Sequence, residues 1–160
     1  MLLIIDVQNY YLNEYTRDVP SKIAKYLKKD EFDFVIFSKF VNHDNSNVAR
    51  AFGWKKMQEP PETDICDELK EYVKENNVFK KDTYSLFKSK SFLKYLEENS
   101  ISNLSICGFD TDACVLATSY EGFDLGFRVN IIEELTVSSI GKRYRDSGLT
   151  ILKRRIQPRL

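Results

Sequence analysis

Short runs rich in apolar residues recur along the chain, and they constrain its fold more than any other feature. The first, Leu2–Ile5, is apolar at every position and stops at Asp6. Strands that are buried on both faces have this pattern, because helices cover both sides of a parallel sheet. Four later runs are predicted as further strands: residues 32–37, 78–79, 104–107 and 127–132.

Segments with apolar residues at helical spacing separate these runs. Helices are predicted over residues 21–29, from Thr63 or Asp64 to about residue 74, over 89–98, over 111–124 and from about Lys142, with a short one near Val48. Strands that alternate with helices indicate a parallel sheet wrapped on both faces. With 160 residues, the chain has the length of one domain, and Pro60-Pro61 is expected to lie in a loop inside it.

Charge and cysteine content narrow the classes of partner and compartment. Twenty-four basic residues balance twenty-four acidic ones, so no overall field attracts nucleic acid or anionic lipid. Residues 142–160 carry seven basic residues and one Asp, a pattern more typical of a solvated helix face than of an RNA or membrane contact. The apolar N-terminus is too short for a signal peptide or a membrane span, and three cysteines without a CxxC pattern suit a reducing compartment. We expect a cytoplasmic protein with no nucleic-acid or membrane partner.

Three chemically active side chains are predicted at the carboxyl ends of strands, where ligands bind in parallel sheets: Asp6, Lys81 and Cys114. A cysteine in the first turn of a helix faces free N–H groups and the positive end of the helix dipole, which favour a thiolate and can bind an oxyanion. Taken singly, Asp6 could be a loop aspartate and Lys81 a surface lysine. A purely structural role as a small apolar residue suits Cys107 better than Cys114.

Three motifs, in order along residues 2–132, resemble those of the isochorismatase-like cysteine hydrolases. The first is D-x-Q, with Asp6 and Gln8. The second is K-x-x-Y-S-x-F, with Lys81, Tyr84, Ser85 and Phe87. The third and most specific is G-x-x-T-D-x-C-V, with Gly108, Thr111, Asp112, Cys114 and Val115. The resemblance implies one isochorismatase-like domain over residues 1–160, with a three-layer Rossmann-like α/β fold and a parallel sheet of five to six strands.

The resemblance also implies a mechanism. Asp6 is the general base that takes the proton of Cys114, while Lys81 lowers the thiol pKa and orients the carboxylate. The thiolate attacks a carbonyl carbon, and a cis peptide bond between Phe109 and Asp110 turns the N–H of Asp110, with that of Cys114, toward the oxyanion. Asp6 then protonates the leaving amine and activates the water that cleaves the thioester.

The loop after the second strand departs from the nicotinamidase branch of the family, which has a D-x-H metal motif and another histidine there. This chain has only His43, so neither a metal nor nicotinamidase activity is expected, and His43 is interpreted as an exposed loop residue. No glycine-rich phosphate motif occurs, so no cofactor is expected. Position alone makes six residues candidates for the substrate pocket: Gln8, Tyr10, Asn42, Trp54, Tyr84 and Phe87.

Hydrolysis of a small amide or ureide C–N bond is the leading hypothesis, because all three triad positions are present. A vinyl-ether hydrolase of the isochorismate type and a non-catalytic binding or scaffold protein are the alternatives. Oxidation of Cys114 as a redox sensor is a further possibility, since a thiol of low pKa oxidises readily. The expected partners are a small-molecule substrate and, as the resemblance implies, further copies of the chain in a dimer or tetramer.

Overall fold

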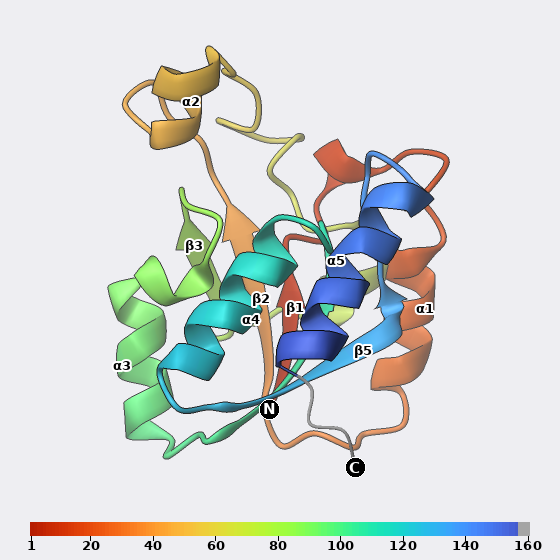
Figure 1. Ribbon diagram of the computed structural model, residues 1–160, viewed down its shortest axis with the longest axis vertical. Coiled ribbons are helices and arrows are strands. Elements are labelled where there is room, and N and C mark those ends of the chain that lie inside the picture. The colour runs from red at the N-terminus through yellow and green to blue at the C-terminus, as the bar shows by residue number, and fades with distance from the viewer. Residues whose placement is uncertain (157–160) are drawn as a thin grey trace.

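The computed structural model describes residues 1–156 and contains one five-stranded parallel sheet (Figure 1). Its strands lie in the order β3-β2-β1-β4-β5. Their bounds are β1 Leu2–Ile5, β2 Val35–Phe40, β3 Val78–Lys81, β4 Asn103–Gly108 and β5 Arg128–Thr136. The predicted α/β fold with a parallel sheet is confirmed. Strand order reverses between β1 and β4, which is the switch point where ligands bind in such sheets.

Helices lie on both faces of the sheet. The α-helices are α1 Val19–Leu27, α2 Asn47–Phe52, α3 Lys90–Glu98, α4 Cys114–Asp124 and α5 Lys142–Arg155. The connections between strands and α-helices contain short 3₁₀ helices: η1 Asn9–Tyr11, η2 Asp67–Tyr72 and η3 Leu86–Lys88. In Figure 1, α4 and α5 cross in front of the sheet, whereas α2 projects beyond the end of β2.

Alternate residues of the strands belong to two apolar clusters, one on each face of the sheet. Leu3, Ile5 and Ile36 belong to the cluster that packs under α3, α4 and α5. Leu2, Ile4 and Phe37 belong to the cluster that packs under α1 and the segment around η2. This alternation follows from the two-residue period of a strand, and burial on both faces explains why β1 is apolar at every position.

The end of β4 lies very close to the backbone of β1. Gly108 has φ +109°, and a Cβ atom there would lie 2.2 Å from the carbonyl oxygen of Ile5. The N–H of Phe109 donates to that same carbonyl at 2.8 Å. Only glycine fits this approach, so the first residue of the cysteine motif brings the loop before Cys114 against the end of β1.

The helix predicted from Thr63 or Asp64 to residue 74 is wrong in extent and type. Ile65 forms an isolated antiparallel bridge with Gln8, and the N–H of Cys66 donates to the carbonyl of Val7. Those backbone groups are paired with the chain after β1, so a helix begins only at Asp67 and has 3₁₀ geometry.

Strand β2 also differs from its prediction, because it is shifted toward the carboxyl end and includes Ser38 and Lys39. The run with helical spacing near Val48 is confirmed as α2, with Ser46 as its N-cap. The basic helix is confirmed as α5, although the last four residues of the basic tail lie outside the described residues. Among residues 1–156, none of the helices combines the length and apolar character that crossing a bilayer requires.

Candidate active site

Asp6, Lys81 and Cys114 meet at the carboxyl ends of β1 and β3 and the start of α4. Lys81 Nζ lies 2.6 Å from Asp6 Oδ2 and 3.3 Å from Cys114 Sγ. All three residues are buried: Asp6 is 0% exposed, Cys114 5% and Lys81 6%. The three motifs, distant in sequence, therefore supply one compact group of an acid, a base and a nucleophile.

Ser38 on β2 fixes the carboxylate of Asp6. Its hydroxyl donates to Asp6 Oδ1 at 2.6 Å and accepts from the N–H of Asp6 at 3.0 Å. Asp6 has φ +48°, a left-handed conformation that costs an ordinary residue about 1–3 kcal/mol and is typical of functional sites. The sequence interpretation missed Ser38, although a polar residue inside the run VIFSKF is a signal that could have marked it.

The Lys81 ammonium forms an ion pair with Asp6, donates to Cys114 Sγ and donates to the carbonyl of Thr83 at 2.9 Å. Burial by itself lowers the pKa of Lys81, but the interactions with Asp6 and Cys114, led by the negative charge of Asp6, outweigh it and raise the pKa above its usual range. Lys81 therefore carries a positive charge at neutral pH. The aromatic ring of Phe40 is also close to the ammonium, with its centroid 5.1 Å from Lys81 Nζ.

The thiol pKa of Cys114 differs from the expectation of a stabilised thiolate. Burial raises this pKa, and the carboxylate of Asp6 raises it further, while Lys81 alone opposes them. One positive charge cannot offset two negative charges in a buried group, so the resting state is a neutral thiol beside an aspartate–lysine ion pair. The predicted position of Cys114 in the first turn of its helix is confirmed, because Cys114 is the first residue of α4.

The loop that leads into α4 is held from the opposite side by the chain after β5. The peptide bond between Phe109 and Asp110 is cis. Asp110 accepts two hydrogen bonds from Ser139, from its N–H and its hydroxyl, each at 2.7 Å. The carbonyl of Asp110 accepts from the N–H groups of Ala113 and Val115, and within residues 1–156 the N–H of Cys114 between them donates to no backbone carbonyl. This N–H is available to a bound group.

Aromatic rings extend outward from the triad. The Trp54 ring lies 6.1 Å from that of Phe40 and 5.5 Å from that of Tyr10, and Trp54 Nε1 donates to Tyr10 Oη at 3.3 Å. Tyr11 packs edge-on against Phe109, at 6.4 Å between ring centroids. Two of the predicted pocket residues, Tyr10 and Trp54, are thus in contact with each other.

Comparison with known families gives one decisive match. The family model described as "Isochorismatase domain" matches residues 1–157. The chain belongs to the isochorismatase family. The predicted family resemblance is confirmed.

One curated relative of the isochorismatase family is similar over part of its length. Isochorismatase family protein 2A of Dictyostelium discoideum is 31% identical over 72 residues, which are 44% of this chain. The matched part is 36% of that relative, so the similarity spans about a third of its length.

Solved structures with the isochorismatase fold superpose on nearly the whole chain. An isochorismatase-like hydrolase from Alkaliphilus metalliredigens has TM-score 0.82 at 20% identity, covering 96% of this chain and 90% of its own. A nicotinamidase from Bacillus subtilis has TM-score 0.80 at 21% identity, and the superposition covers 97% of this chain and 94% of the nicotinamidase. N-carbamoylsarcosine amidase from Thermoplasma acidophilum has TM-score 0.77 at 18% identity, and the superposition covers 97% of this chain and 91% of the amidase. At these identities the superpositions establish the fold.

The metal motif of the nicotinamidase branch has no counterpart among the described residues of this chain. His43 Nε2 lies 2.9 Å from Asp82 Oδ2, and both side chains are about half exposed. Within residues 1–156, no three histidine, cysteine, aspartate or glutamate side chains are arranged to hold a metal ion. The residues present do not fit that metal.

The other predicted pocket residues have different surroundings. Gln8 is buried, and its side-chain amide is fully bonded to backbone. Its Nε2 donates to the carbonyls of Phe40 and Thr63, and its Oε1 accepts from the N–H of Phe40. Asn42 is buried and donates to the carbonyls of Trp54 and Lys56, which closes the loop after β2. The amides of both side chains are therefore bonded to the backbone of neighbouring segments.

Phe87 is not brought to the triad. Its ring packs against Phe92 and Phe127 in the core under α3 and α4. Tyr84 is 48% exposed, at the surface two residues after Asp82. Tyr11, by contrast, belongs to the site although the sequence interpretation missed it: burial raises its pKa, and so do Cys114, Asp6 and Asp110. Its position five residues after Asp6 was the available signal.

Proposed function

We propose that this member of the isochorismatase family hydrolyses the C–N bond of a small amide or ureide through a thioester on Cys114. The observation that carries the proposal is the bridging position of Lys81, 2.6 Å from the carboxylate of Asp6 and 3.3 Å from the sulfur of Cys114 inside a buried group. A purely structural role accounts poorly for such an arrangement, because burying three polar side chains costs free energy.

The protonation states support general-base catalysis by Asp6. Because the resting state holds a thiol, a carboxylate and an ammonium, transfer of the thiol proton to Asp6 leaves the net charge of the group unchanged. The product of that transfer is a thiolate beside the ammonium of Lys81, which remains positive throughout. Ser38, which donates to Oδ1 of Asp6, leaves Oδ2 to receive the proton.

The thiolate then attacks the carbonyl carbon of the substrate, and the carbonyl oxygen takes the negative charge. The N–H groups of Cys114 and Asp110 are the donors proposed for this oxyanion. When the tetrahedral intermediate collapses, Asp6 returns its proton to the leaving nitrogen and an amine or ammonia departs. A water deprotonated by Asp6 cleaves the thioester to a carboxylic or carbamic acid and restores the thiol.

Cleavage of a C–N bond is favoured over the vinyl-ether alternative because the nucleophile, its base and the bridging lysine are all present. Two of the similar structures bear names that describe amide cleavage, a nicotinamidase and N-carbamoylsarcosine amidase, which supports the same choice. No step requires a metal.

A screen of small primary amides and ureides tests this proposal. Wild-type enzyme is expected to release ammonia from at least one of them, and rapid quenching with intact-mass analysis should show an acyl adduct on Cys114. Cys114→Ala should abolish both signals, whereas Cys107→Ala, which alters the other buried cysteine nearby in sequence, should keep them. Ammonia release that persists in Cys114→Ala would overturn the thioester mechanism, and no turnover of any compound by folded wild-type protein would favour the scaffold alternative.

A further inference from the structure

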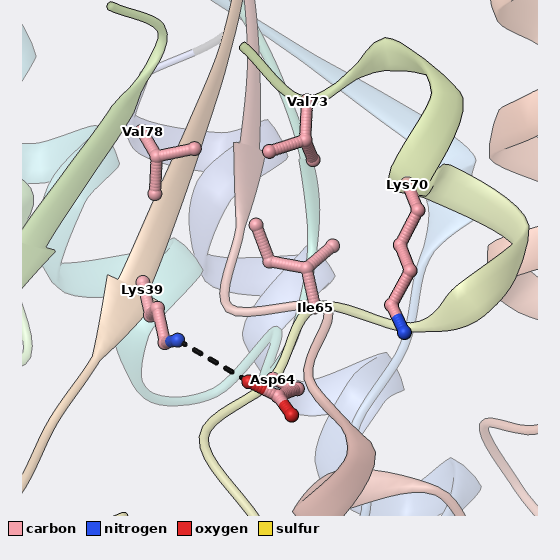
Figure 2. Close-up of a pocket in the computed structure, with 6 residues that line it drawn as sticks. All are labelled: Lys39, Asp64, Ile65, Lys70, Val73 and Val78. Atoms are coloured by element: carbon pink, nitrogen blue, oxygen red, sulfur yellow. Dashed lines mark ion pairs between the residues drawn. The ribbon is translucent and has the colours of Figure 1, made fainter. Parts of the chain in front are cut away.

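A second pocket lies behind the active-site wall, and nothing in the proposed reaction uses it. It has a volume of about 300 Å³, which is at the lower end of small-molecule sites, and six residues line it: Lys39, Asp64, Ile65, Lys70, Val73 and Val78. Figure 2 shows β2 and β3 supplying one side and the segment around η2 supplying the other. The strands alternate their side chains, so Lys39 shares the face of Phe37, whereas its neighbours Ser38 and Phe40 face Asp6 and Lys81.

The floor of this pocket is aliphatic. Ile65, Val73 and Val78 all belong to or pack against the cluster under α1. In Figure 2, Ile65 lies between the two lysines, and Val73 and Val78 lie above them. A compact apolar group placed here would leave water and contact three rigid side chains.

The polar rim has an ion pair that is incompletely satisfied. Lys39 Nζ lies 3.6 Å from Asp64 Oδ1, longer than the 2.7–2.9 Å typical of a charge-assisted hydrogen bond. The Lys39 side chain is only 19% exposed, and within residues 1–156 neither its ammonium nor the Asp64 carboxylate makes a hydrogen bond. Lys70 adds a second positive charge but lies 2.6 Å from Asp67. Both members of the Lys39–Asp64 pair therefore retain the capacity to bind a ligand of opposite charge.

We propose that this pocket binds a small α-amino acid with an apolar side chain. Its carboxylate would bond Lys39, its ammonium would bond Asp64, and its side chain would lie on Ile65, Val73 and Val78. In an α-amino acid the two charged groups are attached to one carbon, so their separation is similar to the 3.6 Å between the pocket ions. One long ion pair thus gives way to two short charge-assisted contacts. A fatty acid or an alkylamine would satisfy only one of the two ions.

The pocket residues are connected by backbone to the active site. Lys39 lies between Ser38, which holds Asp6, and Phe40, whose backbone is bonded by Gln8. Ile65 bridges the backbone of Gln8, and the carbonyl of Asp64 accepts from Asn9. A bound amino acid would therefore stabilise the wall of the site without contact with Cys114.

Methyl NMR with L-leucine as the probe tests this inference. Saturable shifts are expected in the methyl signals of Ile65, Val73 and Val78, and they should persist in Cys114→Ser, because the pocket is separate from the nucleophile. Affinity should fall about tenfold or more in Lys39→Met and in Asp64→Asn. Lys80→Met, which removes an exposed lysine beside Lys39 in the sheet but outside the pocket, is the matched control and should bind like wild type.

4-Methylpentanoate and isoamylamine, which are leucine without its amino group and without its carboxylate, should bind at least about tenfold more weakly than leucine. Equal affinity for 4-methylpentanoate would overturn the assignment to an amino acid. So would the absence of saturable shifts, or shifts that Lys39→Met and Asp64→Asn leave unchanged in proteins with wild-type circular dichroism. These binding measurements do not depend on turnover. A negative result would therefore overturn the amino-acid site without bearing on the proposed hydrolase reaction.

Discussion

At the scale of single residues, the site depends on a charge balance among Asp6, Lys81 and Cys114. The carboxylate and the ammonium neutralise each other at 2.6 Å, and the buried thiol is left neutral. Catalysis by this group requires a proton acceptor rather than a permanently charged sulfur. The role of Asp6 can therefore be separated from that of Lys81 by experiment.

Replacing Asp6 with Asn should make Cys114 more reactive toward iodoacetamide at neutral pH while it abolishes turnover. Asn leaves the charge of Lys81 unopposed, which lowers the thiol pKa, but it cannot take or return a proton. Amide hydrolysis should fall by about 10²–10⁴-fold. Alkylation rates across a pH series, located on Cys114 by mass spectrometry, measure the first effect, and ammonia release measures the second.

Lys81→Met is the paired control for that experiment and should slow alkylation, because it removes the one group that lowers the thiol pKa. Slower alkylation in Asp6→Asn than in wild type would mean that the carboxylate favours the thiolate, contrary to the charge balance described above.

Asp110 should make stability depend on pH between about 4 and 6. Burial raises its pKa from 3.8 to about 6, against two hydrogen bonds from Ser139 that lower it. In that window the folded state binds more protons than the unfolded state, so the free energy of unfolding falls as pH rises, by at most about 3 kcal/mol. Asp110→Asn should flatten this part of the profile in urea denaturation, whereas Asp124→Asn, at the exposed end of α4, should retain it. A slope that Asp110→Asn leaves intact would assign the pH dependence to another group.

At the scale of elements, the site depends on how closely β4 approaches β1. The first residue of the cysteine motif is a glycine because the Ile5 carbonyl occupies the space of a side chain. The same carbonyl accepts the N–H of Phe109, so the loop before Cys114 begins at a fixed point. Gly148 of α5 also lies close to that loop, with a hypothetical Cβ 2.8 Å from the carbonyl oxygen of Thr111.

Gly108→Ala should destabilise the protein by about 3 kcal/mol or more, because the added methyl group meets backbone and φ is +109°. Gly126→Ala is the matched control: its φ is also positive, at +91°, but nothing lies within 4 Å of the added atom. It should cost only about 1–2 kcal/mol. Urea denaturation of both variants measures the difference, and equal losses would show that backbone conformation, not the close approach, requires glycine at residue 108.

At the scale of the whole molecule, the parallel sheet gathers groups from three strand ends into one site and leaves a second pocket on its other face. Several large apolar side chains remain exposed on α4, α5 and the loop between β5 and α5: Phe123, Leu125, Ile140, Tyr144 and Ile151. Sedimentation velocity at micromolar concentration is expected to show a dimer or tetramer, which would cover part of this surface. A single monomer peak across the concentration range would contradict this expectation.

Much of the fold, and the three residues that the structure brings together in the candidate site, were predictable from sequence. Fully apolar runs alternating with amphipathic segments indicate a parallel sheet, because only helices on both faces can bury such strands. Asp6 and Lys81 stand where such runs end and Cys114 stands at the start of a helical segment, in motifs that resemble a known family. These features are local in sequence and need no knowledge of long-range contacts.

The tertiary structure alone decided the direction in which the thiol pKa of Cys114 is shifted, the contact of Ser38 with Asp6 and the absence of a helix at residues 63–66. Each depends on groups far away in sequence: Asp6 and burial raise the thiol pKa, β2 brings Ser38 to Asp6, and Gln8 pairs with Ile65. The second pocket is also a tertiary feature, since its two ions come from β2 and from the chain before η2. Sequence patterns report which side chains will be buried, whereas desolvation and pairing depend on which neighbours share that burial.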